Sequence, residues 1–265
     1  MIDSKTRDTV ELLPMDGNMQ AVLQDALLSS AKVILRGGVF MTGPIDIPSD
    51  TELRIEEDAT LKFIPDFNIY SPVYTRWEGV KCWCMHPCIY INCAENVILS
   101  GKGTVDGSGE AWWEECNEKR SYASSEPVLP SELRLKAMNP DYLTQPSGGG
   151  GRQTQFLRPP LLQIKDSRNI TVRELFFTSS PFWTIHPLFS EHLLIDGIHI
   201  MNPKDAPNTD GIDIESCRDV VVQNSLVEVG DDGIALKSGS GISGIRDGVP
   251  AEDVTIRGCH VKWAH

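Results

Sequence analysis

The chain has 265 residues, of which 40% are hydrophobic and 23% charged, an ordinary composition for a globular protein with a large core. Its 24 basic and 37 acidic residues give a net charge of −13, which argues against nucleic acid or an anionic membrane surface as partner. No run of about 18 apolar residues is present that would span a membrane. The first ten residues lack the apolar core of a secretory signal, so we expect a cytoplasmic protein, or a secreted one if the N-terminus is incomplete.

One segment near the N-terminus has apolar residues at helical spacing. It covers Met19–Leu28, and we expect a helix there. The rest of the chain is dominated by short β-branched runs bounded by Gly, Pro, Asn and Asp, which are typical of strands. The helix would therefore cap the open N-terminal end of a β-stack.

Four of the seven cysteines cluster around His86, in a spacing that is not a common zinc pattern. An odd cysteine count without a signal sequence favours free thiols in a reducing compartment. A structural zinc site is the alternative to buried thiols, and we expect buried thiols because free cysteine is among the most buried residue types. The four are Cys82, Cys84, Cys88 and Cys93.

The β-rich runs repeat along the chain. Each repeat opens with a polar residue and continues with β-formers, and the four clearest members start 23, 27 and 34 residues apart. These members are Asn169–Val172, His192–Ile195, Asp219–Val222 and Asp253–Ile256. Asn96–Leu99 is an earlier member, and Asp50–Ile55 resembles another about two coils before it.

A strand-rich period in the low twenties indicates a solenoid. The strands are mostly apolar and hairpin signals are few, which favours parallel stacking. A leucine-rich repeat would need a leucine ladder with a recurrent Asn, and that pattern is missing. An antiparallel sandwich with accidental spacing is the remaining alternative. We therefore predict an all-β fold, a right-handed parallel β-helix with one N-terminal capping helix.

Two segments depart from the repeat. Glu110–Arg158 is rich in Pro, Ser and Gly, and we expect a long loop flanking a cleft. Gly239–Pro250 is a shorter insertion that accounts for the 34-residue step.

The acidic residues between positions 208 and 237 carry the functional signal. Asn208–Asp213 and Gly230–Lys237 share an Asp-Gly-Ile core at an offset of 22 residues, which is one coil. Equivalent positions on adjacent coils lie about 4.7–4.9 Å apart, so Asp210 should stack on Asp232, with Asp231 beside them.

Three carboxylates at such distances raise at least one pKa, which suits general acid–base chemistry. Inverting glycosidases need a pair of carboxyl groups separated by a water. A solvated turn and a calcium loop are the alternatives, but an EF-hand pattern is not met. We therefore expect no metal and no cofactor at this site.

At these residues the sequence resembles the polygalacturonases, family 28 of the glycoside hydrolases. The matching motifs are Asn208–Asp210, Gly230–Asp232 and the terminal Ala264-His265, where Ala replaces the first Gly of the family's Gly-His-Gly. Three further segments extend the resemblance over nearly the whole chain: Val39–Pro44, Gly101–Gly107 and Ser180–His186.

The resemblance implies a role for each residue of the candidate site. It makes Asp231 the general acid, Asp210 and Asp232 the pair that activates water, and His265 a group that tunes the acid. Asn208, His186 and Lys237 are the candidate substrate-binding residues, with a structural role for His186 as an open alternative.

The family's Arg-x-Lys motif, which binds the substrate carboxylate, lies beyond the histidine and is not in this sequence. We therefore expect residues 1–265 to form a single β-helix domain that is C-terminally truncated relative to the family. The predicted function is hydrolysis of galacturonate-containing oligo- or polysaccharides with inversion. Exo action is preferred because the acidic balance disfavours long polyanions and the 110–158 insertion could block the groove. The alternatives are a non-catalytic carbohydrate-binding or structural β-helix, an inactive fragment, and a calcium-dependent lyase.

Overall fold

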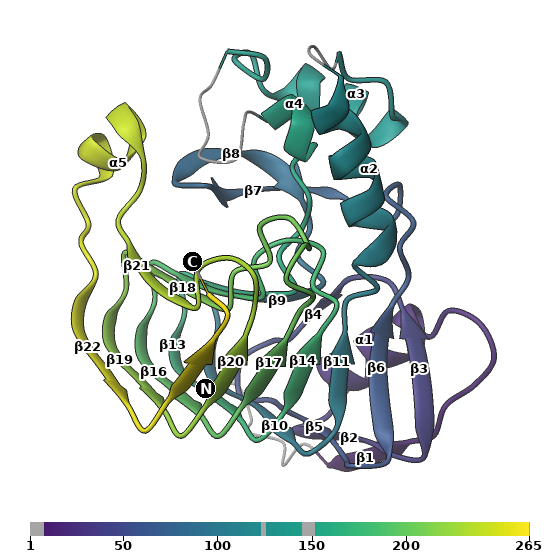
Figure 1. Ribbon diagram of the computed structural model, residues 1–265. Coiled ribbons are helices and arrows are strands. Elements are labelled where there is room, and N and C mark those ends of the chain that lie inside the picture. Colours follow the sequence, from purple (N-terminus) through teal and green to yellow (C-terminus); the bar gives the residue numbers. More distant parts are fainter. Residues whose placement is uncertain (1–7, 123–125, 145–151, 265) are drawn as a thin grey trace, which may run out of the picture.

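The computed structural model describes residues 8–122, 126–144 and 152–264, and its core is a parallel β-helix of three sheets (Figure 1). Sheet A has the order β1 (Thr9–Leu12), β2 (Lys32–Leu35), β5 (Glu52–Ile55), β10 (Glu95–Gly101), β13 (Arg168–Arg173), β16 (Glu191–Asp196), β19 (Arg218–Gln223) and β22 (Glu252–Arg257). Sheet B has the order β3 (Gly38–Thr42), β6 (Ala59–Phe63), β11 (Thr104–Asp106), β14 (Phe176–Thr178), β17 (His199–Met201), β20 (Leu226–Glu228) and β23 (His260–Lys262). Sheet C has the order β4 (Ile45–Asp46), β9 (Ile89–Asn92), β12 (Leu162–Lys165), β15 (Ile185–Leu188), β18 (Ile212–Glu215) and β21 (Ile234–Lys237).

The predicted repeats are the strands of sheet A. The segments that start at Asn96, Asn169, His192, Asp219 and Asp253 lie in β10, β13, β16, β19 and β22, and each pairs in parallel with the next. The predicted parallel stack is therefore confirmed, and an antiparallel sandwich is wrong. The placement of the Asp50–Ile55 repeat two coils earlier is also wrong, because β5 pairs directly with β10.

Inward-facing apolar side chains align from coil to coil and form the core. Val97, Ile170, Leu193 and Val220 share one register position, and each is at most 3% exposed. Stacking of like side chains in this way removes apolar surface from water along the whole length of the β-helix.

The polar residue that opens each repeat has a conformational reason. Asn96, Asn169, His192, Asp219 and Asp253 all have φ between 52° and 61°, the left-handed region that Asn, Asp and His tolerate best. Their side chains also bond along the stack, with Asn169 Nδ2 donating to Asn96 Oδ1 at 2.8 Å. The repeat therefore marks the turn that leads into sheet A.

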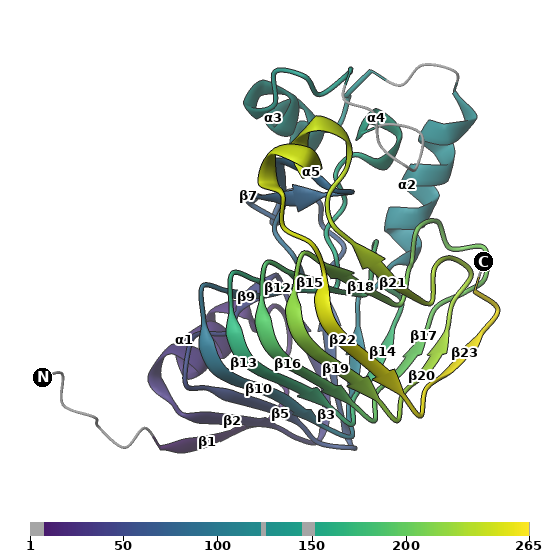
Figure 2. The same cartoon turned by 90° about the vertical axis from the view of Figure 1, so that its left-hand side faces the viewer.

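The predicted N-terminal helix is present as α1 (Gln20–Ser29), with Leu23 and Leu27 buried. It lies at the N-terminal end of the stack, near β2 and β4 (Figure 2). The expectation of one helix is incomplete, however, because both insertions contain helices. The 110–158 excursion holds α2 (Glu110–Ser121), α3 (Pro130–Met138) and α4 (Arg152–Gln155), and the second insertion holds α5 (Gly241–Asp247).

An antiparallel hairpin was not expected from the sequence. It consists of β7 (Pro72–Trp77) and β8 (Val80–Met85), and it lies over the same side of the stack as α2–α5 (Figures 1 and 2). The hairpin accounts for two of the clustered cysteines, Cys82 and Cys84, which are buried. The four clustered cysteines form no disulfide with one another, and Cys93 is exposed. Within the described ranges, no helix is long and apolar enough to cross a bilayer.

We predict that the left-handed residue at the start of a repeat contributes to stability through its backbone conformation. Asn169→Val places a β-branched side chain at φ 61° and should lower the free energy of unfolding by about 1–3 kcal/mol in urea titrations. Asn169→Gly should cost less, since glycine adopts this φ without strain. Thr171→Val, on the same strand, is the control and should change stability by less than about 0.5 kcal/mol. A valine variant as stable as wild type, or a glycine variant as unstable as the valine one, would contradict this account.

Candidate active site

The register between β18 and β21 brings the two Asp-Gly-Ile segments together. Ile212 pairs with Ile234, and the Gly211 amide donates to the carbonyl of Asp232 at 2.8 Å. Asp210 and Asp232 therefore occupy equivalent places on adjacent coils, as the 22-residue offset predicts.

The glycine of the first segment is required by this close stacking. A Cβ at Gly211 would lie 2.3 Å from the carbonyl oxygen of Gly233 and 2.5 Å from a methyl of Val227. Any larger residue would push the two coils apart and so separate the carboxylates of Asp210 and Asp232, which precede these glycines. The Asp-Gly-Ile core thus combines a chemical group with the backbone that positions it.

A third carboxylate, Asp213, joins the cluster. One oxygen of each of Asp210, Asp213 and Asp232 lies within 4.8 Å of the others. Asp213 is not among the catalytic residues predicted from the sequence, yet it is fully buried in the centre of the site. The alternation Ile212-Asp213-Ile214-Glu215 was the available signal, because it directs both acidic side chains to the outer face of β18.

Lys237 supplies the positive charge at the centre of these carboxylates. Its Nζ lies 2.9 Å from Asp213 Oδ1 and 3.4 Å from an oxygen of both Asp210 and Asp232. The same ammonium group lies 4.3 Å from the ring centroid of Trp183, a cation–π distance. An ammonium group therefore occupies the place where a cation shared by these three carboxylates would be bound.

Burial and mutual repulsion change the protonation of the cluster. Desolvation, followed by the charge of Asp231, raises the pKa of Asp210 from 3.8 to about 7. Burial and the neighbouring Asp210 raise the pKa of Asp213 well above its ordinary value. The three carboxylates raise the pKa of Lys237, although its own desolvation acts in the opposite direction. The lysine is therefore charged, and the buried carboxyl groups retain protons to higher pH than free aspartate.

The remaining predicted site residues fall into three groups. Asp231 and Asn208 line the same cavity as Asp210 and Asp232. His186 is buried behind it, with Nε2 at 2.9 Å from Glu215 and Nδ1 at 2.9 Å from Gln163. His265 lies outside the described residues.

The cavity above the acidic cluster has a volume of about 560 Å³, which is within the usual range for small-molecule sites. One side is formed by Glu78 and Gly79 at the turn of the β7–β8 hairpin, and another by residues 238–240 before α5. Trp183 lies at the wall of the same cavity but is buried, with the Lys237 ammonium over its ring. His186 reaches this cavity only through Glu215, so its position favours a structural role, while its predicted contact with substrate stays a prediction.

Comparison with known proteins shows which family this geometry resembles. Residues 147–260, which include the whole described acidic cluster, match the family model of glycosyl hydrolases family 28. The chain is 28% identical over 233 residues to a protein from Vitis vinifera named probable polygalacturonase, covering 86% of this chain and 41% of that protein.

Other proteins similar to this chain are bacterial. It is 25% identical to an endo-polygalacturonase of Pectobacterium carotovorum, covering 79% of this chain and 47% of the relative. A crystal structure of an exopolygalacturonase from Thermotoga maritima superimposes with a TM-score of 0.79 at 28% identity, covering 98% of this chain and 63% of that one. The chain thus spans less than half the length of the two sequence relatives.

The raised pKa of Asp210 predicts a pH dependence of stability. Between about pH 4 and pH 7 the folded state holds a proton that the unfolded chain has released, so stability should fall as pH rises through this range. Asp210→Asn lacks the titrating group, so its free energy of unfolding should fall less steeply over that range than the wild type's. The exposed Asp205→Asn variant is the control and should retain the wild-type slope. Identical slopes for wild type and Asp210→Asn in urea titrations would contradict the buried, proton-retaining state of Asp210.

Proposed function

We propose that this protein hydrolyses the α-1,4-galacturonosidic bonds of pectin-derived poly- or oligogalacturonides with inversion of configuration. The observation that carries the proposal is the cavity in which Asp210, Asp231 and Asp232 meet on two adjacent coils. Such a cluster can hold one carboxyl group protonated and another ionised, as an inverting glycosidase requires. The match of residues 147–260 to the family 28 model and the similarity to polygalacturonases support the same reaction.

We assign Asp231 as the general acid that protonates the glycosidic oxygen, and Asp210 and Asp232 as the pair that activates the water. Asn208 shapes the site, and His265 tunes the acid. Lys237 is assigned as a substrate-binding residue, and its ammonium group also pairs with Asp210, Asp213 and Asp232. Neither a metal nor a cofactor has a part in this proposal.

One observation favours a different division of roles. The pKa of about 7 at Asp210 keeps this carboxyl protonated in mildly acidic solution, which is a property of a general acid. The reactivity of single variants decides between the two assignments.

We further propose exo action, because the β7–β8 hairpin covers the outer face of sheet C. Thr75 Oγ1 donates to Gln163 on β12 at 2.9 Å, and Arg76 Nη1 donates to Glu215 on β18 at 3.1 Å. Trp77 stacks on Phe182 with 4.9 Å between ring centroids. These buried contacts leave no room for a polymer to pass along the outer face of the earlier coils.

The tip of the hairpin also closes the cavity on the side of the second insertion. The Ser240 amide donates to the carbonyl of Gly79 at 2.9 Å, and Lys81 Nζ lies 2.6 Å from Asp247 at the end of α5. A chain end can enter such a cavity, whereas the middle of a long polymer would have to pass through these contacts. The hairpin therefore adds a wall to the one expected from the 110–158 insertion, whose Gln155 bonds to Asn208 at the cavity.

The assignment of the acid can be tested with single Asn variants. Asp231→Asn should lower kcat on trigalacturonate by about 10²–10⁴-fold, because it removes the transferable proton. Asp210→Asn and Asp232→Asn should lower it as well, through loss of water activation.

An aryl galacturonide with a good leaving group needs little protonation, so it separates the two roles. The Asp231→Asn variant should lose much less activity on this substrate than on trigalacturonate, whereas the other two variants should lose as much on both. If Asp210→Asn were the variant rescued by the aryl substrate, the roles of Asp210 and Asp231 would be exchanged. A wild-type protein without turnover on either substrate would favour a non-catalytic carbohydrate-binding β-helix.

Exo action predicts the pattern of products. Early in the digestion of polygalacturonate, monomer should be the main product, and viscosity should fall slowly relative to the reducing ends released. Chromatography of the first products together with viscometry measures both quantities. Early oligomers of mixed length with a rapid loss of viscosity would show endo action and contradict the wall formed by the hairpin.

A further inference from the structure

The carboxyl groups assigned to water activation lie in surroundings that favour their protonated form. Asp210 is only 3% exposed, and the fully buried Asp213 lies beside it. Among the described residues, Asp210 Oδ1 has no hydrogen-bond partner. Burial without a donor disfavours an ionised carboxylate. A general base must nevertheless be ionised to accept a proton from water, so this site needs a fixed positive charge.

Lys237 provides that charge, because its ammonium group lies between the two carboxylates of the pair. Its Nζ is 3.4 Å from an oxygen of Asp210 on one coil and 3.4 Å from an oxygen of Asp232 on the next. An opposite charge at such a distance lowers the pKa of a carboxyl group by about 1–3 units. The equal distances mean that one ammonium group acts on both members of the pair.

Contacts on its other sides hold the ammonium group in this place. Asp213 Oδ1, at 2.9 Å, is the nearest of its three carboxylate oxygens, and the Trp183 ring centroid lies 4.3 Å from Nζ. The parallel register sets Lys237 beside Glu215 on the adjacent coil, so β21 directs the lysine to the outer face of sheet C. The ammonium group is therefore fixed relative to both carboxylates.

The other charged groups around the pair cannot take over this task. Three of them, Glu78, Glu215 and Asp231, are further acids that line the same cavity. Arg158 is fully buried, and its Nη1 donates to two backbone carbonyls at 2.7 and 3.1 Å. Lys237 is thus the basic residue of the described lining that contacts the pair.

We propose that Lys237 is a positioning residue for the hydrolysis, whose ammonium group keeps Asp210 and Asp232 ionised for the activation of water. The inference rests on the proposed function and gives Lys237 a role that is separate from contact with substrate. Burial, followed by the charge of Asp231, raises the pKa of Asp210 to about 7, and the charge of Lys237 opposes that rise. Without the lysine, the pair would ionise only at higher pH.

The pH profile of kcat/KM tests this proposal, because its acidic limb reports the ionisation of the base in the free enzyme. The aryl galacturonide is the substrate, since its leaving group needs little protonation. Loss of the positive charge favours protonated carboxyl groups, so Lys237→Met should move the acidic limb to higher pH by about 1–3 units. Below the limb, kcat/KM should fall by about 10- to 1,000-fold with KM nearly unchanged, and it should recover as pH rises.

Two further variants of the lysine separate its charge from its shape. Lys237→Arg retains the positive charge, so its acidic limb should stay close to that of the wild type. Lys237→Gln replaces Lys237→Met as the uncharged variant if the methionine variant does not fold, and its limb should move in the same direction.

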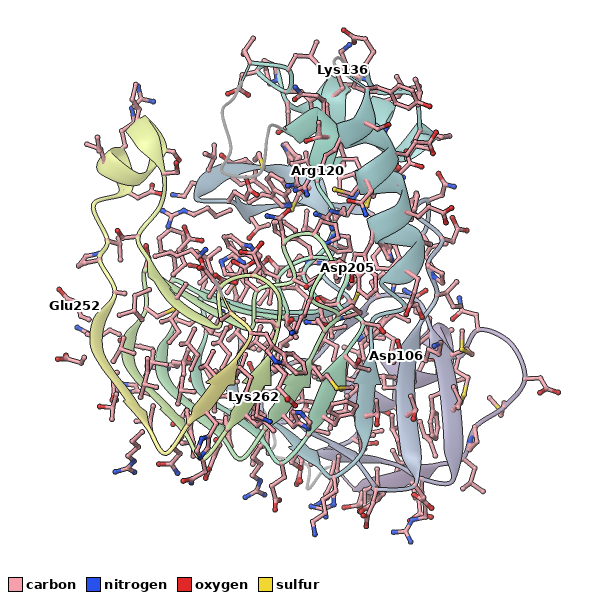
Figure 3. All side chains as sticks on the ribbon, in the orientation of Figure 1. Asp106, Arg120, Lys136, Asp205, Glu252 and Lys262 are labelled. Carbon is pink, nitrogen blue, oxygen red and sulfur yellow. The ribbon has the colours of Figure 1, made fainter. Side chains whose placement is uncertain are left out.

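Lys262→Met is the matched control. Lys262 also pairs with a carboxylate on the adjacent coil, with Nζ 3.0 Å from Glu228 Oε1. It lies on sheet B, however, away from the β7–β8 hairpin and the cavity beneath it (Figure 3). This variant should keep the wild-type pH profile.

Three outcomes would overturn the inference while leaving the proposed function intact. A loss of activity in Lys237→Met that is equal at every pH would show a merely structural role. A raised KM with an unmoved acidic limb would show substrate contact alone. An acidic limb that moves as far in Lys237→Arg as in Lys237→Met would exclude the charge as the cause. A wild-type protein without turnover would instead overturn the proposed function, and this inference with it.

Discussion

The spacing between parallel coils is the constraint on which the candidate site depends. Each coil repeats its backbone at the separation of hydrogen-bonded strands, so residues at one register position must meet on adjacent coils. This brings Asp210 and Asp232 together, and the Gly211 amide that donates to Asp232 O at 2.8 Å fixes their separation. Like charges at this distance oppose folding, and the Lys237 ammonium, 2.9 Å from Asp213, offsets part of that repulsion. A solenoid core with much apolar burial can tolerate the remaining cost.

The β7–β8 hairpin forms one wall of the cavity and is fixed to the β-helix by buried polar contacts. Arg76 is fully buried, and a buried guanidinium group is strongly destabilising unless it is paired. It contacts Glu215 on β18, Ser216 and Asp247 at the end of α5, so one side chain connects the hairpin, the stack and the second insertion. His186 contacts Glu215 in turn. Burial alone would raise the pKa of Glu215, but the hydrogen bond from His186 and the charge of Arg76 outweigh it and hold this pKa below its ordinary value. The polar network beneath the hairpin thus fixes one side of the cavity.

The sequence predicted the parts of the structure that depend on repetition. Polar residues such as Asn169 and Asp219 opened each repeat because the turn before sheet A needs a left-handed residue, and the 22-residue offset followed from one coil. Features without a periodic signal were missed. The apolar residues of α2 are few among many charged ones, and Trp112 packs on Phe67 and Tyr70, which lie outside the excursion. The hairpin could have been predicted, because two β-rich runs are joined by Glu78-Gly79. The cysteines of the second run were instead interpreted only as thiols. Asp213 was undervalued because its partner, Lys237, lies 24 residues away on the next coil.

The central claim is that carboxylates stacked on adjacent coils deliver a proton and a water from opposite faces of a galacturonide. Proton NMR of the first product from trigalacturonate tests it most directly, because the anomeric signal is read before mutarotation. The account predicts that the new reducing end appears as the β-anomer, since water replaces an α-linked leaving group from the opposite face. Initial formation of the α-anomer would mean retention of configuration through a covalent intermediate, and it would contradict the arrangement of acid and water proposed for this site.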